Sequence, residues 1–168
     1  MPTRILSALR PGRFMIRAVI AAALAIAAPA AFADVTVTQP WVRGTVPPQK
    51  TTGAFMRLQS NRDAKLVGVS SSAAKLVEMH EMAMVNNVMR MRPVNEIALP
   101  GGKDVALKPG GYHIMLMGIE HQLKEGDVVP LTLTVRDSDG KTHTIAVQAP
   151  VRALTSPAPK PSAPPDRK

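Results

Sequence analysis

The sequence predicts an all-β protein, built as an antiparallel β-sandwich or a Greek-key barrel. Short segments of alternating apolar and polar residues recur along the chain, and turn residues such as Pro-Gly-Gly and Asp-Gly separate them. No segment longer than about ten residues keeps a helical period. Many short strands at this spacing are typical of sandwiches and barrels.

The predicted strands follow one another through residues 34–151, which we expect to form the folded domain. Residues 34–42 and 53–60 alternate apolar and polar side chains, as do residues 105–118 on either side of a Pro-Gly-Gly turn. Residues 128–151 contain the clearest hairpin, two alternating runs joined by Asp-Ser-Asp-Gly. A domain of about 120 residues can bury a sufficient core without covalent cross-links.

The start of the chain has the features of an export signal. Four arginines and no acidic residue make residues 1–17 positive, and residues 18–33 carry no charge. This uncharged run is shorter than the roughly 20 apolar residues that a transmembrane helix needs, and it ends in Ala-Phe-Ala, a pattern that signal peptidases cleave. We therefore expect residues 1–33 to be removed, leaving an exported protein that starts at Asp34 and has no membrane span. An uncleaved membrane anchor is the alternative.

The end of the chain, residues 152–168, is predicted to be a disordered, proline-rich extension without His or Met. The net charge of +9 lies mostly in the two ends, with +4 in residues 1–33 and +3 in residues 152–168. The domain between them keeps about +2 and has no basic stripe with interleaved aromatic residues. Nucleic-acid binding is therefore not expected.

Residue types and motifs that the sequence lacks exclude several kinds of chemistry. The chain has no cysteine, which excludes a disulfide framework and every thiolate site. It also has no glycine-rich phosphate loop, no Gly-x-Ser-x-Gly elbow and no His-Glu-x-x-His helix, because HEMAM at residues 80–84 has Met84 where the second histidine belongs. A hydrolase of a familiar kind is therefore not expected.

Histidine and methionine gather in two stretches, MHEMAMVNNVMRMR at residues 79–92 and GYHIMLMG at residues 111–118. Because side chains two residues apart share a strand face, an extended conformation would group residues within each stretch. The groups are His80, Met82 and Met84; Met89 and Met91; and His113, Met115 and Met117. If these segments meet at one end of a sandwich, they form a mixed nitrogen and thioether site.

The donor atoms of these stretches suit copper. Thioether sulfur is a soft, neutral ligand that favours Cu(I) over hard ions such as Mg²⁺, and imidazole binds both copper states. Zinc would be expected to recruit cysteine or carboxylate beside histidine. The alternative is that the methionines fill the core, which is a common use of this flexible side chain. Two His-x-Met pairs favour copper, but the pattern leaves open which methionines bind.

The same residues resemble the PCuAC family, periplasmic copper chaperones that serve the dinuclear copper centre of cytochrome c oxidase. The family's ligand pattern is a histidine, ten residues, a methionine, twenty-one residues and His-x-Met, and His80, Met91, His113 and Met115 have these spacings. The flanking segments PWVR, TGAFM, MRMRPV, LKPGGYHIMLMG and LKEGDVVPLTL are also similar, so the resemblance spans about Val35 to Val151.

The resemblance implies a cupredoxin-like β-sandwich in which these two histidines and two methionines hold one Cu(I) near the surface. It further implies a metallochaperone that delivers copper to an oxidase subunit or another copper assembly factor. We expect a monomer with one copper site, because the tail lacks the His- and Met-rich pattern with which some family members take a second copper.

The remaining candidates are assigned to packing or to the surroundings of the site. The unmatched methionines Met82, Met84, Met89 and Met117 could shield the site, form a soft entry path to it or pack, and packing or shielding is favoured over direct ligation. Met56 is expected in the core, His121 and His143 at exposed positions, and Trp41 either in the packing or near the site.

Three other functions remain open on the residues alone. An electron-transfer cupredoxin is disfavoured, because the blue-copper site depends on a cysteine thiolate. A copper-dependent oxidase or reductase would need an open coordination position and a substrate pocket, for which the sequence has no pattern. A structural β-sandwich with a methionine-rich core is the third.

Overall fold

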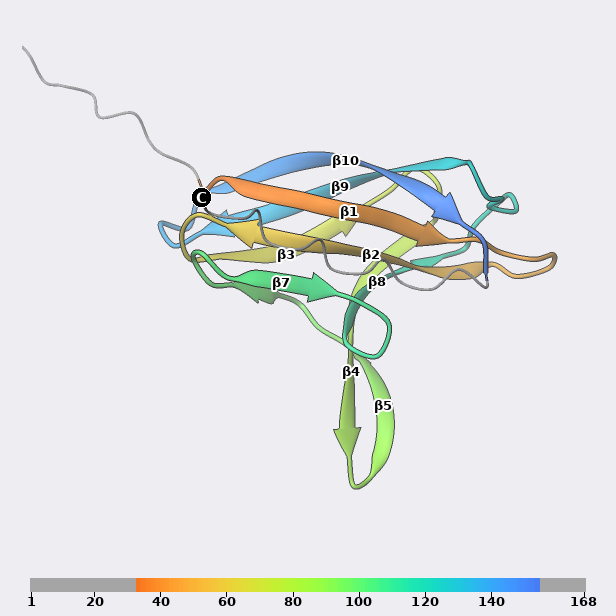
Figure 1. The fold of residues 1–168 in the computed structure, drawn as a ribbon, viewed down its shortest axis with the longest axis horizontal. Helices are drawn as coiled ribbons and strands as arrows, with labels where there is room; N and C mark the ends of the chain where they lie inside the picture. Colours follow the sequence, from red (N-terminus) through yellow and green to blue (C-terminus); the bar gives the residue numbers. More distant parts are fainter. Residues whose placement is uncertain (1–32, 155–168) are drawn as a thin grey trace, which may run out of the picture. The chain divides into compact units, whose positions relative to one another are not determined.

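The computed structural model describes residues 33–154 and confirms the predicted all-β class. Ten strands and no helix make up this part of the chain (Figure 1). The strands are β1 (Val35–Arg43), β2 (Thr51–Ser60), β3 (Ala64–Ser70), β4 (Leu76–Val85), β5 (Val88–Pro93), β6 (Ile97–Leu99), β7 (Asp104–Leu107), β8 (Tyr112–Met117), β9 (Val128–Asp137) and β10 (Thr142–Arg152). Within the described range there is accordingly no helix that could cross a membrane.

The strands form a sandwich and not a closed barrel. They pair in the order β5-β4-β8-β2-β1-β10-β9-β3-β6, with β7 added to β2. The first five strands make one half of the sandwich, the last four make the other, and the β1–β10 pair joins them. This joining pair is parallel, with Val42 opposite Val151, while the other strand pairs of the described residues are antiparallel, as predicted.

The core lies between the two halves and follows the alternation of the sequence. Leu58, Ile114 and Leu116 from one half are fully buried, as are Leu66, Leu131 and Leu133 from the other. Met56 belongs to this core, as expected. Burying one large aliphatic side chain contributes about 1.5–3 kcal/mol, so this set is the main source of the fold's stability.

The predicted hairpin at residues 128–151 is confirmed as β9 and β10, which pair from Thr142 opposite Arg136 to Pro150 opposite Val128. The turn closes with a backbone hydrogen bond from Gly140 to Asp137, and Gly140 has a φ of 79°, which favours glycine. Asp137 is buried and accepts a hydrogen bond from the amide of Ala33.

The two remaining histidines differ from each other in their surroundings. His121 is exposed, as expected. His143 was expected to be exposed, but it is only partly so, because its Nδ1 lies 3.5 Å from the buried Asp137 carboxylate. The predicted export signal up to residue 32 and the predicted tail from residue 155 lie outside the described residues.

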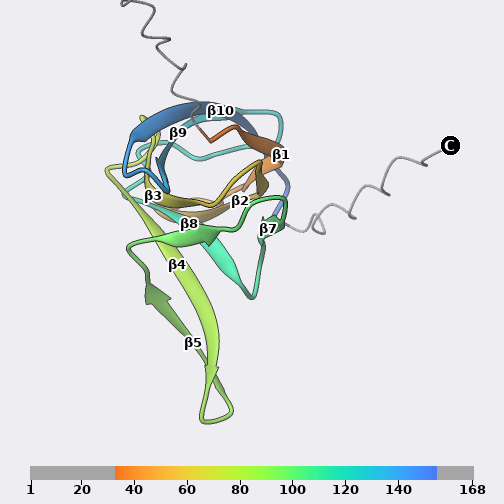
Figure 2. The same ribbon diagram turned by 90° about the vertical axis from the view of Figure 1, so that its left-hand side faces the viewer.

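A second hairpin, β4–β5, was not predicted as such. Its two-residue turn is Asn86-Asn87, and both residues have positive φ, 50° and 60°, which is the conformation of a type I′ turn. Figures 1 and 2 show this hairpin extending away from the body of the sandwich. The stretch MHEMAMVNNVMRMR is therefore two paired strands whose turn end lies beyond the core.

Replacing Leu133 by alanine tests the core assignment. Because Leu133 is fully buried between the halves, Leu133→Ala should lower the free energy of unfolding by about 2–5 kcal/mol, measured by urea denaturation. Val128→Ala on the same strand is the control, because Val128 is 55% exposed and its truncation should change stability by less than about 0.5 kcal/mol. Equal losses in the two variants would contradict the assignment.

Candidate metal centre

The four residues of the predicted ligand set lie on three neighbouring strands. His80 is on β4, Met91 is on β5, and His113 and Met115 are on β8. In the order β5-β4-β8 the middle strand pairs with both others. The ligand set, spread over 36 positions of sequence from 80 to 115, is thus gathered onto one edge of the sandwich.

Strand register places the four side chains on one face of the sheet. His80 is directly opposite His113, and Met91 is directly opposite Met82, two residues along β4 from His80. Residues opposite each other in an antiparallel pair point to the same face. The shared face is the outer one, because Ile114 between His113 and Met115 points into the core.

Three of these side chains are in close proximity. The Nε2 atom of His113 is 3.3 Å from the Sδ atom of Met91. The two imidazole rings are 5.9 Å apart between centroids and nearly edge to face. Met115 lines the same cavity as His113. The structure thus brings His80, Met91 and His113 together and places Met115 beside them.

His113 is held in the tautomer that a metal ligand needs. Its Nδ1–H donates a hydrogen bond to the carbonyl oxygen of Gly111 at 2.9 Å. In neutral imidazole this leaves the Nε2 lone pair free, and that atom faces the Met91 sulfur. Two atoms that face each other with lone pairs are stabilised when a cation binds both. Two ligand atoms of one tetrahedral metal ion lie about 3.5 Å apart when the metal–ligand bonds are 2.0–2.3 Å, which is close to the observed separation of 3.3 Å.

His80, on the neighbouring strand β4, also has one ring nitrogen fixed by a hydrogen bond. Its Nε2–H donates to the Glu78 carboxylate at 2.8 Å, while its Nδ1 atom is buried without a hydrogen-bond partner. An unpaired buried nitrogen is costly, and binding a metal ion would satisfy it. Each histidine therefore has one nitrogen fixed by the protein and the other available, and the residues present fit a metal ion.

The exposure of the site is graded. His80 and His113 are 9% and 6% exposed, whereas Met91 on the projecting hairpin is 51% exposed. Among the described residues, no group of three or more His, Cys, Asp or Glu side chains could hold a metal ion. The donors gathered here are accordingly mixed imidazole and thioether.

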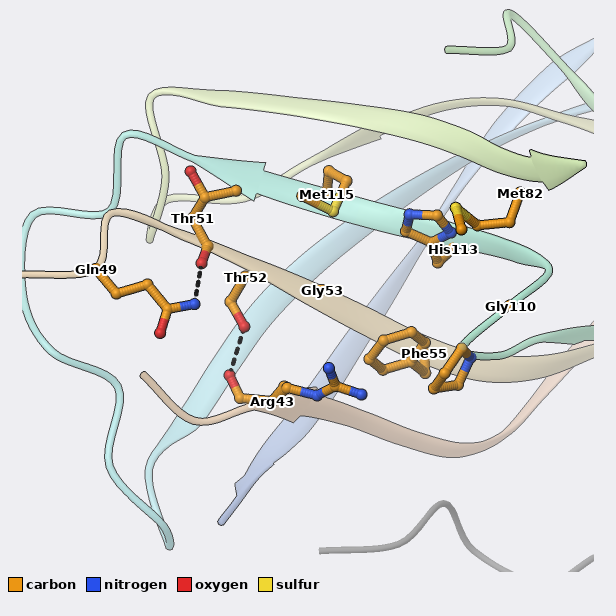
Figure 3. A pocket seen from close by; sticks show the side chains of 11 residues that line it. Arg43, Gln49, Thr51, Thr52, Gly53, Phe55, Met82, Gly110, His113 and Met115 are labelled. Carbon is orange, nitrogen blue, oxygen red and sulfur yellow. Dashed lines mark hydrogen bonds between the residues drawn. The ribbon is translucent and has the colours of Figure 1, made fainter. Parts of the chain in front are cut away.

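A cavity of about 300 Å³ opens beside His113 and Met115. Figure 3 shows Met82 next to His113 on one side of it, with Phe55 and Arg43 on the other. Met82 therefore borders the site, which agrees with a shielding role. The sequence alone left open whether Met82 lies beside the site or in the core.

Aromatic rings support the cavity from β1 and β2. Trp41 is buried and lies 4.5 Å from the Phe55 ring, and Phe55 lies 6.4 Å from the His113 ring. A Cβ atom on Gly53 would come within 2.8 Å of the Phe55 ring, so glycine is needed for this ring position. Sequence reasoning missed Phe55 as a neighbour of the site, although TGAFM was one of the segments shared with the PCuAC pattern.

The opposite face of the hairpin carries a charged clamp. Arg92 on β5 donates two hydrogen bonds to Glu81 on β4, at 2.6 and 3.0 Å. Hydrogen bonding from Arg92 is the main cause that lowers the pKa of Glu81. Tyr112 lies opposite Glu81 on β8, and burial is the main cause that raises its pKa. With a lowered folded-state pKa, Glu81 stabilises the fold above the usual carboxylate range, and this contribution is lost as pH falls through the lowered pKa.

The fold and the outer-face residues define the class of this protein as a small β-sandwich of the PCuAC type. It is similar to the copper-bound PCuAC domain from PmoF2, with a TM-score of 0.56 and 23% identity over 71% of this chain and 92% of that one. It is also similar to apo-DR1885 from Deinococcus radiodurans, with a TM-score of 0.51 and 25% identity over 90% of this chain and 95% of that one. The predicted resemblance is thus confirmed.

The chain belongs to the LpqE-like family, described as "Putative lipoprotein LpqE-like", which matches residues 35–151. It is 34% identical over 114 residues to the putative lipoprotein Lxx21020 of Leifsonia xyli subsp. xyli, covering 67% of this chain and 68% of that protein. It is 30% identical over 121 residues to the uncharacterized protein RP573 of Rickettsia prowazekii, covering 68% and 67%.

Breaking the clamp should loosen the hairpin without unfolding the sandwich. Glu81→Gln removes the negative charge and leaves one neutral acceptor oxygen for Arg92, so amide exchange in β5 should accelerate severalfold while the β9–β10 amides stay protected. Glu96→Gln, which removes the charge from an exposed ion pair with Lys65 on β3, away from the hairpin, is the control and should leave β5 unchanged. Unchanged exchange in β5 of Glu81→Gln would show that the clamp does not hold the hairpin.

Proposed function

We propose that this protein is a periplasmic copper metallochaperone that carries one Cu(I) on His80, Met91, His113 and Met115. The observation that carries the proposal is the 3.3 Å contact between the free Nε2 of His113 and the Met91 sulfur, beside the unpartnered Nδ1 of His80. The similarity to a PCuAC domain whose solved structure is copper-bound supports the choice of metal.

The chemistry of the donors agrees with Cu(I) as cargo. Thioethers are soft and neutral, and neutral imidazole adds two nitrogen donors, so the set favours Cu(I) over oxygen-seeking ions. Because the chain has no cysteine, the donors cannot be lost by disulfide formation in an oxidising compartment. Methionine sulfoxide formation is the remaining oxidative hazard, and it would fall first on the exposed Met91.

The graded exposure supports release by ligand exchange. His113 is held by the Gly111 carbonyl and is nearly buried, whereas Met91 lies on the projecting hairpin. In the proposed transfer, a recipient's ligand replaces Met91 first, while His113 and Met115 still hold the ion. Copper is then never free in solution, and no bond of a substrate is made or broken, which is the behaviour of a carrier and not of an enzyme.

The recipient that we propose is an oxidase subunit of the dinuclear copper type or another copper assembly factor, reached in the periplasm after removal of residues 1–33. A protein whose methionines serve only as core filler is the alternative. Exposure argues against it, because Met84, Met89 and Met91 near the outer end of the hairpin are exposed while Met56 and Met79 already fill the core.

Anaerobic Cu(I) titration against a chromogenic chelator tests the ligand set. Met91→Leu keeps the size and apolarity of the side chain and removes the sulfur. Removing a residue that only orients a metal ligand already lowers metal affinity by about 10- to 100-fold, so removing a ligand should lower the affinity for the first Cu(I) by at least that much. Met117→Leu on β8 is the control, because Met117 shares the outer face but is outside the ligand set. Equal affinities in Met91→Leu and the unaltered protein would exclude Met91 as a ligand.

A further inference from the structure

The β4–β5 hairpin arranges four methionines as two facing pairs. Met82 is directly opposite Met91, and Met84 is directly opposite Met89. The Ala83–Arg90 pair lies between them and points to the other face of the hairpin. We refer to the four methionines on one face as the methionine ladder.

The register also brings the facing sulfurs close. Val85 and Val88 flank the two-residue turn and form a hydrogen-bonded pair, so the pairs Met84–Met89 and Met82–Met91 occupy non-hydrogen-bonded positions. At such positions opposite Cα atoms are about 4.5 Å apart and the side chains approach more closely than elsewhere in a sheet. Thioethers on facing methionines can therefore reach one ion.

Packing does not account for the outer end of the ladder. Met84 is 62% exposed and Met89 is 45% exposed, on a hairpin that extends away from the sandwich (Figure 2). The hairpin's charged residues Arg90, Arg92 and Glu81 alternate with the methionines and so face the other side. The strands of the hairpin thus place no cation on the ladder face, although Arg43 of β1 lines the cavity with Met82 at the inner end.

The inner end of the ladder meets the proposed copper site. Met91 contacts His113, and Met82 is two residues from His80 on the same face and lines the cavity with His113. A continuous row of soft donors therefore runs from the exposed turn of the hairpin to the two nearly buried histidines.

We propose that Met84 and Met89 form a second soft-metal site, which captures Cu(I) at the end of the hairpin and passes it along Met82 and Met91 to the histidines. This inference rests on the proposed function, which supplies the inner site. Two thioethers bind a soft cation more weakly than a set that also contains two imidazoles. The ion therefore moves from the outer site to the inner site, which has the higher affinity. Met91 belongs to both the ladder and the inner site and is the point of transfer.

The ladder is tested by titrating the purified protein, labelled with ¹³C at the methionine methyl groups, with Ag(I) as a redox-inert soft cation. The first equivalent should shift the Met91 and Met115 methyl signals, and the second should shift those of Met84 and Met89. In the double variant Met84→Leu/Met89→Leu the second equivalent should be lost and the first retained.

Two further variants separate this inference from other readings. Val85→Ala/Val88→Ala removes apolar area from the same hairpin end and keeps every sulfur, so it should retain both equivalents. His113→Ala should weaken the first equivalent while Met84 and Met89 still shift. A first equivalent that leaves Met91 and Met115 unmoved would instead overturn the inner site, and with it the proposed function.

The second site itself fails on either of two results. Binding of a single equivalent by the unaltered protein would overturn it, and so would a second equivalent that survives in Met84→Leu/Met89→Leu. If the Val85→Ala/Val88→Ala variant lost the second equivalent as fully as the leucine variant did, the apolar tip and not its sulfur would be responsible.

Discussion

The pairing of β4 with β8 is the constraint on which the rest of the centre depends. It sets His80 directly opposite His113, and a slip of one residue would turn one of the two rings into the core. The register is fixed from behind, because Ile114 and Leu116 of β8 and Met79 of β4 are buried on the inner face. The hydrophobic core thus determines not only stability but also which imidazoles meet on the outside.

The outer layer then converts this register into a defined donor geometry. The Gly111 carbonyl and the Glu78 carboxylate each accept a hydrogen bond from one imidazole nitrogen, so in the neutral ring the other nitrogen carries the lone pair. The hairpin contacts the core only at its inner end, through Met79, so the position of the exposed Met91 depends on cross-strand pairing and on the Glu81–Arg92 clamp. Two buried, hydrogen-bonded histidines and an exposed methionine agree with the proposed carrier, which must both bind an ion and release it.

Much of this arrangement could be predicted from the sequence, because strand alternation is a local property. The grouping of His113, Met115 and Met117 and the β9–β10 hairpin required only the period of two and a glycine turn. The β4–β5 hairpin was missed because its Asn86-Asn87 turn lacks the glycine that marks most type I′ turns. The parallel β1–β10 pair, the Phe55 ring beside His113 and the burial of His143 against Asp137 depend on contacts distant in sequence, which local patterns do not encode.

The charge of the site follows from its neutral donors. Thioether and neutral imidazole add no negative charge, so a bound Cu(I) keeps its full positive charge, unlike an ion held by thiolates. The only carboxylate tied to the donor set in the described contacts is Glu78, which accepts the hydrogen of His80 and offsets that charge through the ring. Because this carboxylate acts indirectly and Met91 lies open to solvent, a recipient with anionic ligands would have both an electrostatic advantage and a place of entry in the proposed transfer. The direction of that transfer would then come from a recipient whose ligands carry the negative charge that these donors lack.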